Sequence, residues 1–429
     1  MLGAVSVTLL ALPVALWVWS AVSLAANRAI AEKAGFPVLV RWITPTNPLW
    51  MFYGNTIISL CRMLGVRTSI FPRYYLFGWE GQERYNAHRE FGDLFMLVAP
   101  GGNWLYVGNS EAAYDILHRR TEFRRNIEQF AVLDVYGKNL STTDDQEWQK
   151  HRKVTAVTFT ERNNQLVWRA SLAQAHGMLQ YWTERSTQPI RTLSDDTKVF
   201  TLNVLAAALF SREYPFESQE ESLAKAKAGE NNQELSYQYR DSLSKILKKI
   251  VPIMVFGGER LKARWLPKSW REAGAAVSNF RSYVTGLINE ERARREKAHS
   301  SKGDSLWQRH DLVSALVRAC ESEGNEDGVS VRSSESRTMT LTEQEIVSNL
   351  FVYAFAGNDT TAITLAHLLV NLAANPQTQE WIAEEIRHYL PGDDYTQWSY
   401  DAASKLKRCQ AVLVSLSHFY LIHFEICVG

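Results

Sequence analysis

The chain has 429 residues, 46% of them hydrophobic, and its 47 basic and 46 acidic side chains give a formal net charge of +1. This length allows one large domain or two ordinary ones, and the balanced charge shows no basic footprint, so no nucleic-acid partner is expected. Four cysteines without paired spacing argue against a disulfide framework or a zinc knuckle and fit a reducing compartment: Cys61, Cys320, Cys409 and Cys427.

The N-terminal segment is apolar and uncharged. Residues 2–26 contain no charged side chain, and Arg28, Lys33 and Arg41 follow directly. About twenty apolar residues span a bilayer, so residues 1–27 are predicted to be a single-pass membrane anchor, with the bulk of the chain on the cytosolic side. A cleaved signal peptide is the alternative, but it would have a basic residue before a shorter apolar core.

The rest of the chain is divided by its composition. We expect a stiff connector punctuated by prolines, then one large folded domain, then a short tail unrelated to what precedes it; these are residues 28–60, 61–414 and 415–429. No metal-ligating cluster is apparent in any of them.

The first strands of the domain are predicted at 93–99 and 104–107, where two apolar and aromatic runs flank the turn sequence Pro-Gly-Gly-Asn. Ser110 is expected to cap a short helix that ends near Arg119.

A polar helix is predicted to open near Asp144 or Asp145 and to carry Trp148 and Arg152 four residues apart. Side chains at this spacing share one face of a helix, where an indole N–H and a guanidinium can both reach an anion. The alternative is a solvated basic face that happens to carry one aromatic residue.

Helical spacing of apolar residues continues through most of the chain, at 163–183, 197–210, 275–297, 311–319 and 377–390, with another helix beginning at 400. The stretches 219–234 and 321–338 are polar and expected to be exposed. Residues 245–256 set a basic cluster beside an apolar run, which fits either a buried segment or one that enters the bilayer.

The longest predicted helix runs from Thr342 to Pro376. Thr342 and Glu345 form a capping box, and Pro376 is a stop signal. Apolar residues on both sides predict a helix that crosses a core: Ile346, Leu350, Phe351, Phe355, Leu365, Leu368 and Leu369.

The middle of this helix is unsuited to plain core packing, because a glycine and four polar residues follow Ala356. Glycine costs about 1 kcal/mol relative to alanine in a helix, and threonine or asparagine can divert backbone hydrogen bonds. An interrupted structural helix with a polar face toward water is one explanation.

The sequence Ala356-Gly357-Asn358-Asp359-Thr360-Thr361 also resembles the oxygen-binding motif of the cytochromes P-450, the haem-thiolate monooxygenases. The resemblance implies that Ala356, Gly357 and a locally opened helix make room for dioxygen over the haem iron, and that Asp359 and Thr360 deliver protons to it. In the same family a Trp-x-x-x-Arg pair binds a haem propionate, the role implied for Trp148 and Arg152.

The resemblance carries expectations about fold and partners. It implies a mainly α protein with a small β-sheet, an α+β fold, here preceded by one transmembrane helix and lacking the C-terminal part. It further implies haem (iron protoporphyrin IX), a lipophilic substrate, O2, an NADPH-dependent reductase and a place in the endoplasmic reticulum membrane, as in microsomal, possibly fungal, members.

The chain departs from the family near its end. The positions expected to hold Glu-x-x-Arg are Ser415 and His418, and no Phe-x-x-Gly-x-x-x-Cys-x-Gly loop is present. Neither Cys409 nor Cys427 can be carried over as the iron ligand, so no haem-thiolate centre is expected in this chain. A catalytically inactive, membrane-tethered fragment or interaction protein is therefore the alternative function. Val414-Ser415 can be encoded by GTGAGT, the usual start of an intron, which predicts that the tail is a gene-model artefact.

Overall fold

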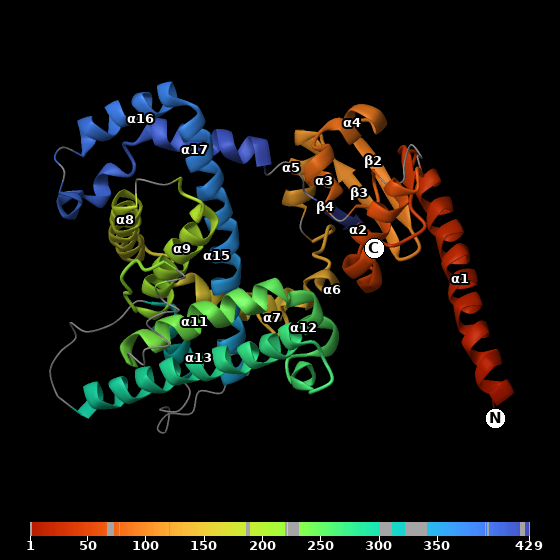
Figure 1. Ribbon diagram of the computed structural model, residues 1–429, viewed down its shortest axis with the longest axis horizontal. Helices are drawn as coiled ribbons and strands as arrows, with labels where there is room; N and C mark the ends of the chain where they lie inside the picture. The colour runs from red at the N-terminus through yellow and green to blue at the C-terminus, as the bar shows by residue number, and fades with distance from the viewer. Residues whose placement is uncertain are drawn as a thin grey trace. The chain divides into compact units, whose positions relative to one another are not determined.

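The structure is a computed structural model that divides into two compact units, Met1–Gln129 with Ser417–Gly429, and Phe130–Leu416 (Figure 1). The residues it describes are 2–66, 73–76, 78–119, 121–185, 189–218, 221, 231–300, 311–321, 341–390, 392, 394–420 and 425–428. Most of the predicted polar stretches, 219–234 and 321–338, lie outside these residues.

The first unit is built on a four-stranded sheet in the order β1-β2-β3-β4. Strand β1 (Val38–Val40) is parallel to β2 (Leu94–Ala99), and β2 is antiparallel to β3 (Gly102–Val107), as the predicted hairpin requires. Strand β4 (Glu425–Val428) is antiparallel to β3. The sheet thus joins segments from both ends of the sequence.

Helix α1 (Leu2–Lys33) has an exposed part and a packed part. Its apolar side chains from Val14 to Val22 are mostly exposed, whereas Leu24 and Ala31 are buried in a cluster with residues of β2. Asn27 Nδ2 donates to the Ala99 carbonyl at 2.8 Å. Among the described residues only α1, over Pro13–Lys33, is long and apolar enough to cross a membrane.

The predicted connector contains a helix, α2 (Pro48–Met63). Asn47 caps it by accepting from the Trp50 N–H, and Pro48 occupies the first turn, where a missing N–H costs nothing. Three short helices complete this unit: α3 (Trp79–Glu83), α4 (Asn86–Phe91) and α5 (Ser110–His118). The cap of α5 is Asn109, whose side chain accepts from the Ala112 N–H, so the prediction of Ser110 was wrong by one residue.

The second unit is helical, and α6 (Ile127–Phe130) leads into it. Its helices follow in order: α7 (Asp145–Ala156), α8 (Glu161–Glu184), α9 (Leu193–Phe210), α11 (Asn231–Lys248), α12 (Ile250–Phe256), α13 (Lys268–Ser300), α14 (Leu312–Glu321), α15 (Glu343–Ala374), α16 (Pro376–Tyr389) and α17 (Lys407–Tyr420). The main core is formed by α9, α11, α13, α14 and the first half of α15. In α12, Ile253 is buried while Phe256 is partly exposed, so the apolar run at 245–256 is neither wholly core nor wholly surface.

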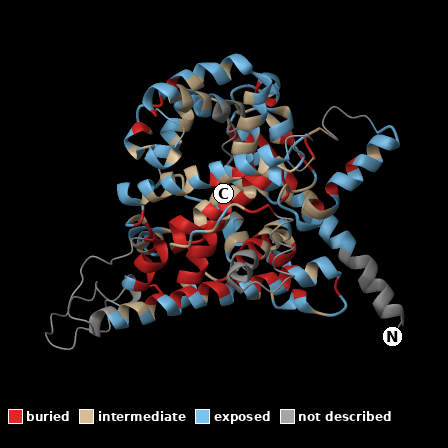
Figure 2. Ribbon diagram, turned by 60° about the vertical axis from the view of Figure 1, so that its left-hand side comes forward, coloured by how far each residue is buried: buried red, intermediate tan, exposed pale blue. Residues whose placement is uncertain are grey.

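Helix α15 begins with the predicted capping box, in which Thr342 and Glu345 each accept from the other's backbone N–H. Its first half is buried through Ile346, Leu350 and Phe351. The second half is not, because the main core ends before it: Leu365, Leu368 and Leu369 are only partly buried. The prediction of core on both sides was therefore right for half of the helix. Figure 2 shows the same contrast, with buried residues gathered in one part of this unit and exposed helices at its other end.

Candidate functional site

Helix α7 presents the predicted Trp148 and Arg152. The Asp144 side chain caps the helix at its predicted start, Trp148 is half-buried and Arg152 is exposed. Burial raises the pKa of the Tyr353 phenol on α15, and the charge of Arg152 partly offsets that rise. Arg152 therefore lies beside α15, about one turn before Ala356.

A buried polar network fixes α7 against α15. Asn349 Nδ2 lies 2.8 Å from His151 Nδ1, and Lys150 Nζ lies 3.1 Å from Glu345 Oε2. Because an amide NH2 can only donate, His151 Nδ1 is the acceptor and the imidazole is neutral with its proton on Nε2. That proton points into a buried position 3.6 Å from Glu345 Oε1. These contacts fix the position of α7, which carries Trp148 and Arg152, along α15.

Charge and burial oppose each other in this network. Burial lowers the pKa of His151, although the carboxylate of Glu345 works against it. Burial alone would raise the pKa of Glu345, but hydrogen bonds from the Thr342 backbone and Lys150 outweigh it, and the pKa lies below its usual value. At neutral pH the pair is therefore a neutral imidazole beside a carboxylate.

The central motif of α15 forms continuous α-helix. The Thr360 hydroxyl donates to the Ala356 carbonyl at 2.7 Å, and both residues are exposed. A threonine hydroxyl bonded to the carbonyl four residues earlier leaves the backbone ladder in place. The local opening expected at Gly357 is thus not present in this structure.

The other face of the motif packs against α9. A Cβ at Gly357 would lie 2.8 Å from Leu205 Cδ2, so α9 packs closely here and the end of the Leu205 side chain would have to move to admit a larger residue. Asn358 is buried, and its Oδ1 accepts from the Thr201 hydroxyl at 2.8 Å. Gly357 and Asn358 therefore hold helices together, while Ala356, Asp359 and Thr360 are left outside this contact.

A pocket between α9, α11 and α15 reaches Asp359. Its wall is rich in charged side chains, with some apolar ones, from Asp195, Lys198, Val199, Leu202, Arg240, Asp241, Ser244, Leu247, Lys248, Asn358 and Asp359. Asp359 thus lines this pocket, on a different side of α15 from the exposed Thr360.

A haem site needs donors for the propionates, space beside α15 and an axial ligand for the iron. Arg152 and Trp148 can donate to a propionate, and the exposed surface around Ala356 and Thr360 leaves room beside α15. The axial ligand is different: burial and the Glu385 carboxylate raise the pKa of Cys409, so its thiol stays protonated. Within the described residues no His, Cys, Asp and Glu side chains cluster as metal ligands. The described residues fit the distal and propionate sides of a haem, and the described Cys409 packs in a separate cluster with Leu390, Ala402 and Leu406.

Sequence reasoning missed the residues that position this site. Thr201 and Leu205 precede the motif by about 150 residues, and His151 precedes Asn349 by almost 200, so no local pattern pairs them. Gly357, a glycine in the middle of a core helix, was the one local indication of this contact, because glycine often marks a close approach of two backbones.

Comparison with known proteins identifies the family. A family model described as Cytochrome P450 matches residues 78–414. The chain belongs to the cytochrome P450 family. The matched range contains both predicted motifs, and the predicted resemblance is confirmed.

Individual relatives of this P450 chain include fungal proteins. It is 28% identical over 367 residues to a cytochrome P450 monooxygenase of Penicillium roqueforti, covering 83% of this chain and 59% of that protein. It is 26% identical over 375 residues to one from Arthrobotrys oligospora, covering 85% and 61%. The chain thus spans about three fifths of the length of these curated relatives.

A solved structure supports the fold. The crystal structure of the cytochrome P450DA heme domain superposes with a TM-score of 0.55 at 18% identity, covering 79% of this chain and 64% of that one. The prediction of a mainly helical P450 fold with a small sheet is confirmed.

Proposed function

We propose that the protein is a haem-dependent monooxygenase that inserts one oxygen atom of O2 into a lipophilic small molecule. One observation supports this beyond family membership: packing against α9 uses Gly357 and Asn358 but not Asp359 or Thr360.

The residues of α7 and α15 have separate roles in binding the haem and in handling protons. Arg152 and Trp148 bind a propionate of the haem and so orient it against α15. When bound, the haem supplies the oxygen-activating chemistry. Asp359 exchanges protons with water in the charged pocket, and the Thr360 hydroxyl holds a proton on the exposed face, where its present acceptor is Ala356 O.

The expected partners follow from the family. Electrons come from an NADPH-dependent reductase, and α1 anchors the protein in the endoplasmic reticulum with the bulk of the chain in the cytosol. The proposed regions are an anchor at 1–27, a connector at 28–60, a catalytic domain at 61–414 and a tail at 415–429. Resistance to carbonate extraction tests the anchor; deletion of residues 2–22 should abolish it and leave the packed turn from Leu24 intact.

Thr360→Ala tests the proton-delivery role. In a chimera that joins the C-terminal part of a family relative to this chain, supplied with membranes and reductase, the variant should form less product per NADPH consumed and more peroxide. Thr364→Ala is the matched control, because Thr364 is also exposed and makes the same kind of bond, to Thr360 O at 2.8 Å. An unchanged ratio in Thr360→Ala, or an equal loss in the control, would argue against the role.

A second candidate is a membrane-tethered interaction protein without catalysis. It is favoured by the surroundings of Cys409, which packs against the cluster of Leu390, Ala402 and Leu406 and whose pKa is raised by burial and by the Glu385 carboxylate. The reduced carbon-monoxide spectrum of the full chain separates the two functions. A red-shifted Soret band shows a thiolate-ligated haem and favours the monooxygenase, whereas folded protein without it favours the second candidate.

A further inference from the structure

The side-chain amide of Asn349 on α15 is held by hydrogen bonds at both of its ends. Its Oδ1 accepts from the Leu140 N–H at 2.9 Å, and its Nδ2 donates to the Glu345 carbonyl at 2.7 Å. Turning the amide by half a turn would set its NH2 against the Leu140 N–H and its oxygen against the Glu345 carbonyl, so both bonds would be lost. The second N–H of Nδ2 is therefore the one that meets His151 Nδ1, 2.8 Å away.

This contact between α7 and α15 forms only with a neutral His151. In an imidazolium both ring nitrogens are donors, so a proton on Nδ1 would face the NH2 of Asn349 across 2.8 Å. Turning the buried ring by half a turn would place a carbon atom there and lose the bond as well. Protonation therefore either separates α7 from this part of α15 or breaks the bonds that hold Asn349.

The surroundings of the imidazole favour the neutral form. Burial is the largest effect and lowers the pKa of His151. Glu345, whose Oε1 lies 3.6 Å from Nε2, works against burial, while the charge of Lys150 adds to it. Glu147 on α7 contributes a weaker attraction for the charged ring. Helix α14 also packs against α7, and its buried residues 312–317 carry no charge. The folded contact is therefore most stable with the ring uncharged.

His151 lies between the two residues proposed to bind the haem propionate. It is adjacent to Arg152 and three residues after Trp148, within a helix of 12 residues. A shift of α7 at His151 therefore also moves the guanidinium that is to meet the propionate. The position of Arg152 thus depends on the charge of its neighbour.

We propose that His151 is a positioning residue that holds α7 on α15 when neutral and releases it when protonated, so that the propionate contact of Arg152 weakens in mildly acidic solution. The release concerns the protein alone, whereas the effect on the propionate rests on the proposed haem site. An exposed imidazole with the usual pKa of about 6.5 is about nine-tenths protonated at pH 5.5. Opening of the contact should therefore be up to about tenfold more frequent at pH 5.5 than at pH 7.5.

Hydrogen exchange of the α7 amides, followed by mass spectrometry on the full chain, tests the release. The wild type and His151→Gln are compared at pH 7.5 and 5.5, after correction for the intrinsic effect of pH on exchange. Glutamine can accept from Asn349 and donate toward Glu345, but it does not titrate. The substitution therefore keeps the contact and removes its response to pH.

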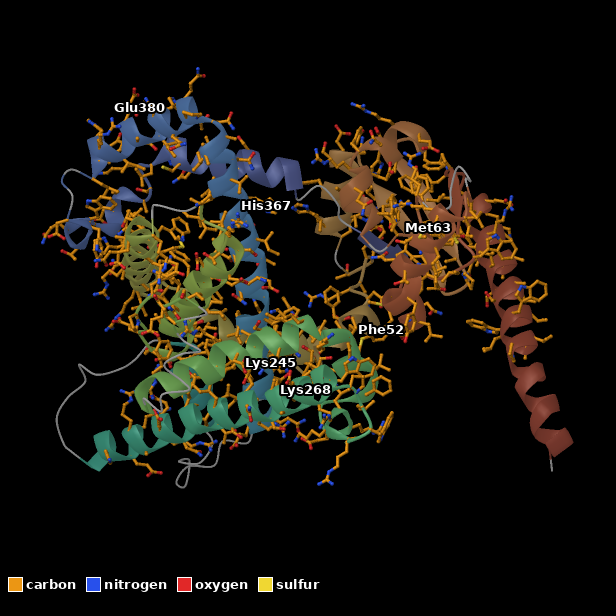
Figure 3. The ribbon with its side chains drawn as sticks, viewed as in Figure 1. Phe52, Met63, Lys245, Lys268, His367 and Glu380 are labelled. Atoms are coloured by element: carbon orange, nitrogen blue, oxygen red, sulfur yellow. The ribbon has the colours of Figure 1, made fainter. Side chains whose placement is uncertain are left out.

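His367→Gln is the control, because His367 is an exposed histidine on the same helix. It lies 18 residues after Asn349, or about 27 Å along the axis. Figure 3 shows it on the part of α15 that lies away from α11 and α13, where Lys245 and Lys268 are labelled. Its loss should leave the response of α7 unchanged.

We expect exchange in α7 to be up to about tenfold faster at pH 5.5 in the wild type and in His367→Gln, and to be independent of pH in His151→Gln. No acceleration in the wild type, or an equal one in His151→Gln, would overturn the proposal.

The same exchange measurement with haem added tests the effect on the propionate contact. Haem should protect α7 equally at both pH values in His151→Gln and less at pH 5.5 in the wild type. Equal protection of the wild type at both pH values would overturn this part of the proposal. No protection in any sample would contradict the proposed haem site, while the exchange without haem still decides on the release by His151.

Discussion

The Thr201 hydroxyl on α9 donates to Asn358 Oδ1 on α15 at 2.8 Å, and both residues are buried. This bond lies one residue after Gly357, which the Leu205 side chain of α9 contacts closely. The family's central motif thus combines packing and chemistry in neighbouring residues of one helix.

Asn358→Ala should destabilise the protein by about 0.5–1.5 kcal/mol, because it removes the hydrogen bond between α9 and α15 and leaves the Thr201 hydroxyl only the Thr197 and Lys198 carbonyls of its own helix. Thr360→Ala should change the free energy of unfolding by less than about 0.5 kcal/mol, because its side chain is exposed. Denaturant unfolding monitored by circular dichroism measures both. Equal losses would show that Thr360 is also a packing residue.

Gly357→Ala should destabilise by about 1–3 kcal/mol, because the new methyl group would lie 2.8 Å from Leu205 Cδ2. Gly286 in α13 is a control from the same unit, since a Cβ there meets nothing within 4 Å. Gly286→Ala should stabilise by about 0.5–1 kcal/mol, as alanine favours helix. A neutral Gly357→Ala would contradict the close approach of α9.

The stability of the protein should fall as the pH drops below about 6.5, the usual pKa of histidine. Burial lowers the pKa of His151, so between this lowered value and about 6.5 the unfolded chain binds more protons than the folded one. Unfolding curves measured from pH 7.5 to 5.5 should show this loss, and His151→Gln should reduce it. A slope unchanged by the substitution would show that the loss comes from other groups.

The sequence predicted local features well and long-range contacts poorly. The capping box of Thr342 and Glu345 was predicted because both partners lie within one turn. Helix α2 was missed because Pro48 was interpreted as stiffening a connector, although Asn47 followed by proline is a helix start. The exposed second half of α15 could not be foreseen, because an apolar residue in the sequence carries no record of what packs on it.

The candidate site divides in the same way. The spacing of Trp148 and Arg152 predicts a shared helix face from the residues alone. The attachment of that helix to α15 through His151 and Asn349 depends on residues nearly 200 positions apart, which only the fold brings together. The family resemblance suggested the roles of Trp148 and Arg152, and the structure showed where α7 places them beside α15.

Cys409→Ser should leave any haem spectrum of the protein unchanged. Burial and the Glu385 carboxylate raise the pKa of this thiol, whereas an iron ligand needs a thiolate. The absorbance spectra of the oxidised and the reduced carbon-monoxide forms provide the comparison. Loss of a red-shifted band in the variant would identify Cys409 as the ligand after all.

If α7 and α15 together form a haem site, the full chain should bind haem in a titration followed by absorbance. Arg152→Ala should weaken binding by about tenfold, because it removes a charged hydrogen bond to a propionate worth about 1.5 kcal/mol. The control is Lys153→Ala, which removes an equal charge from the next exposed position of the same helix. The expected result is saturable binding that is weakened by the change at 152 and not by the change at 153. No saturable binding, or the same loss in both variants, would contradict it.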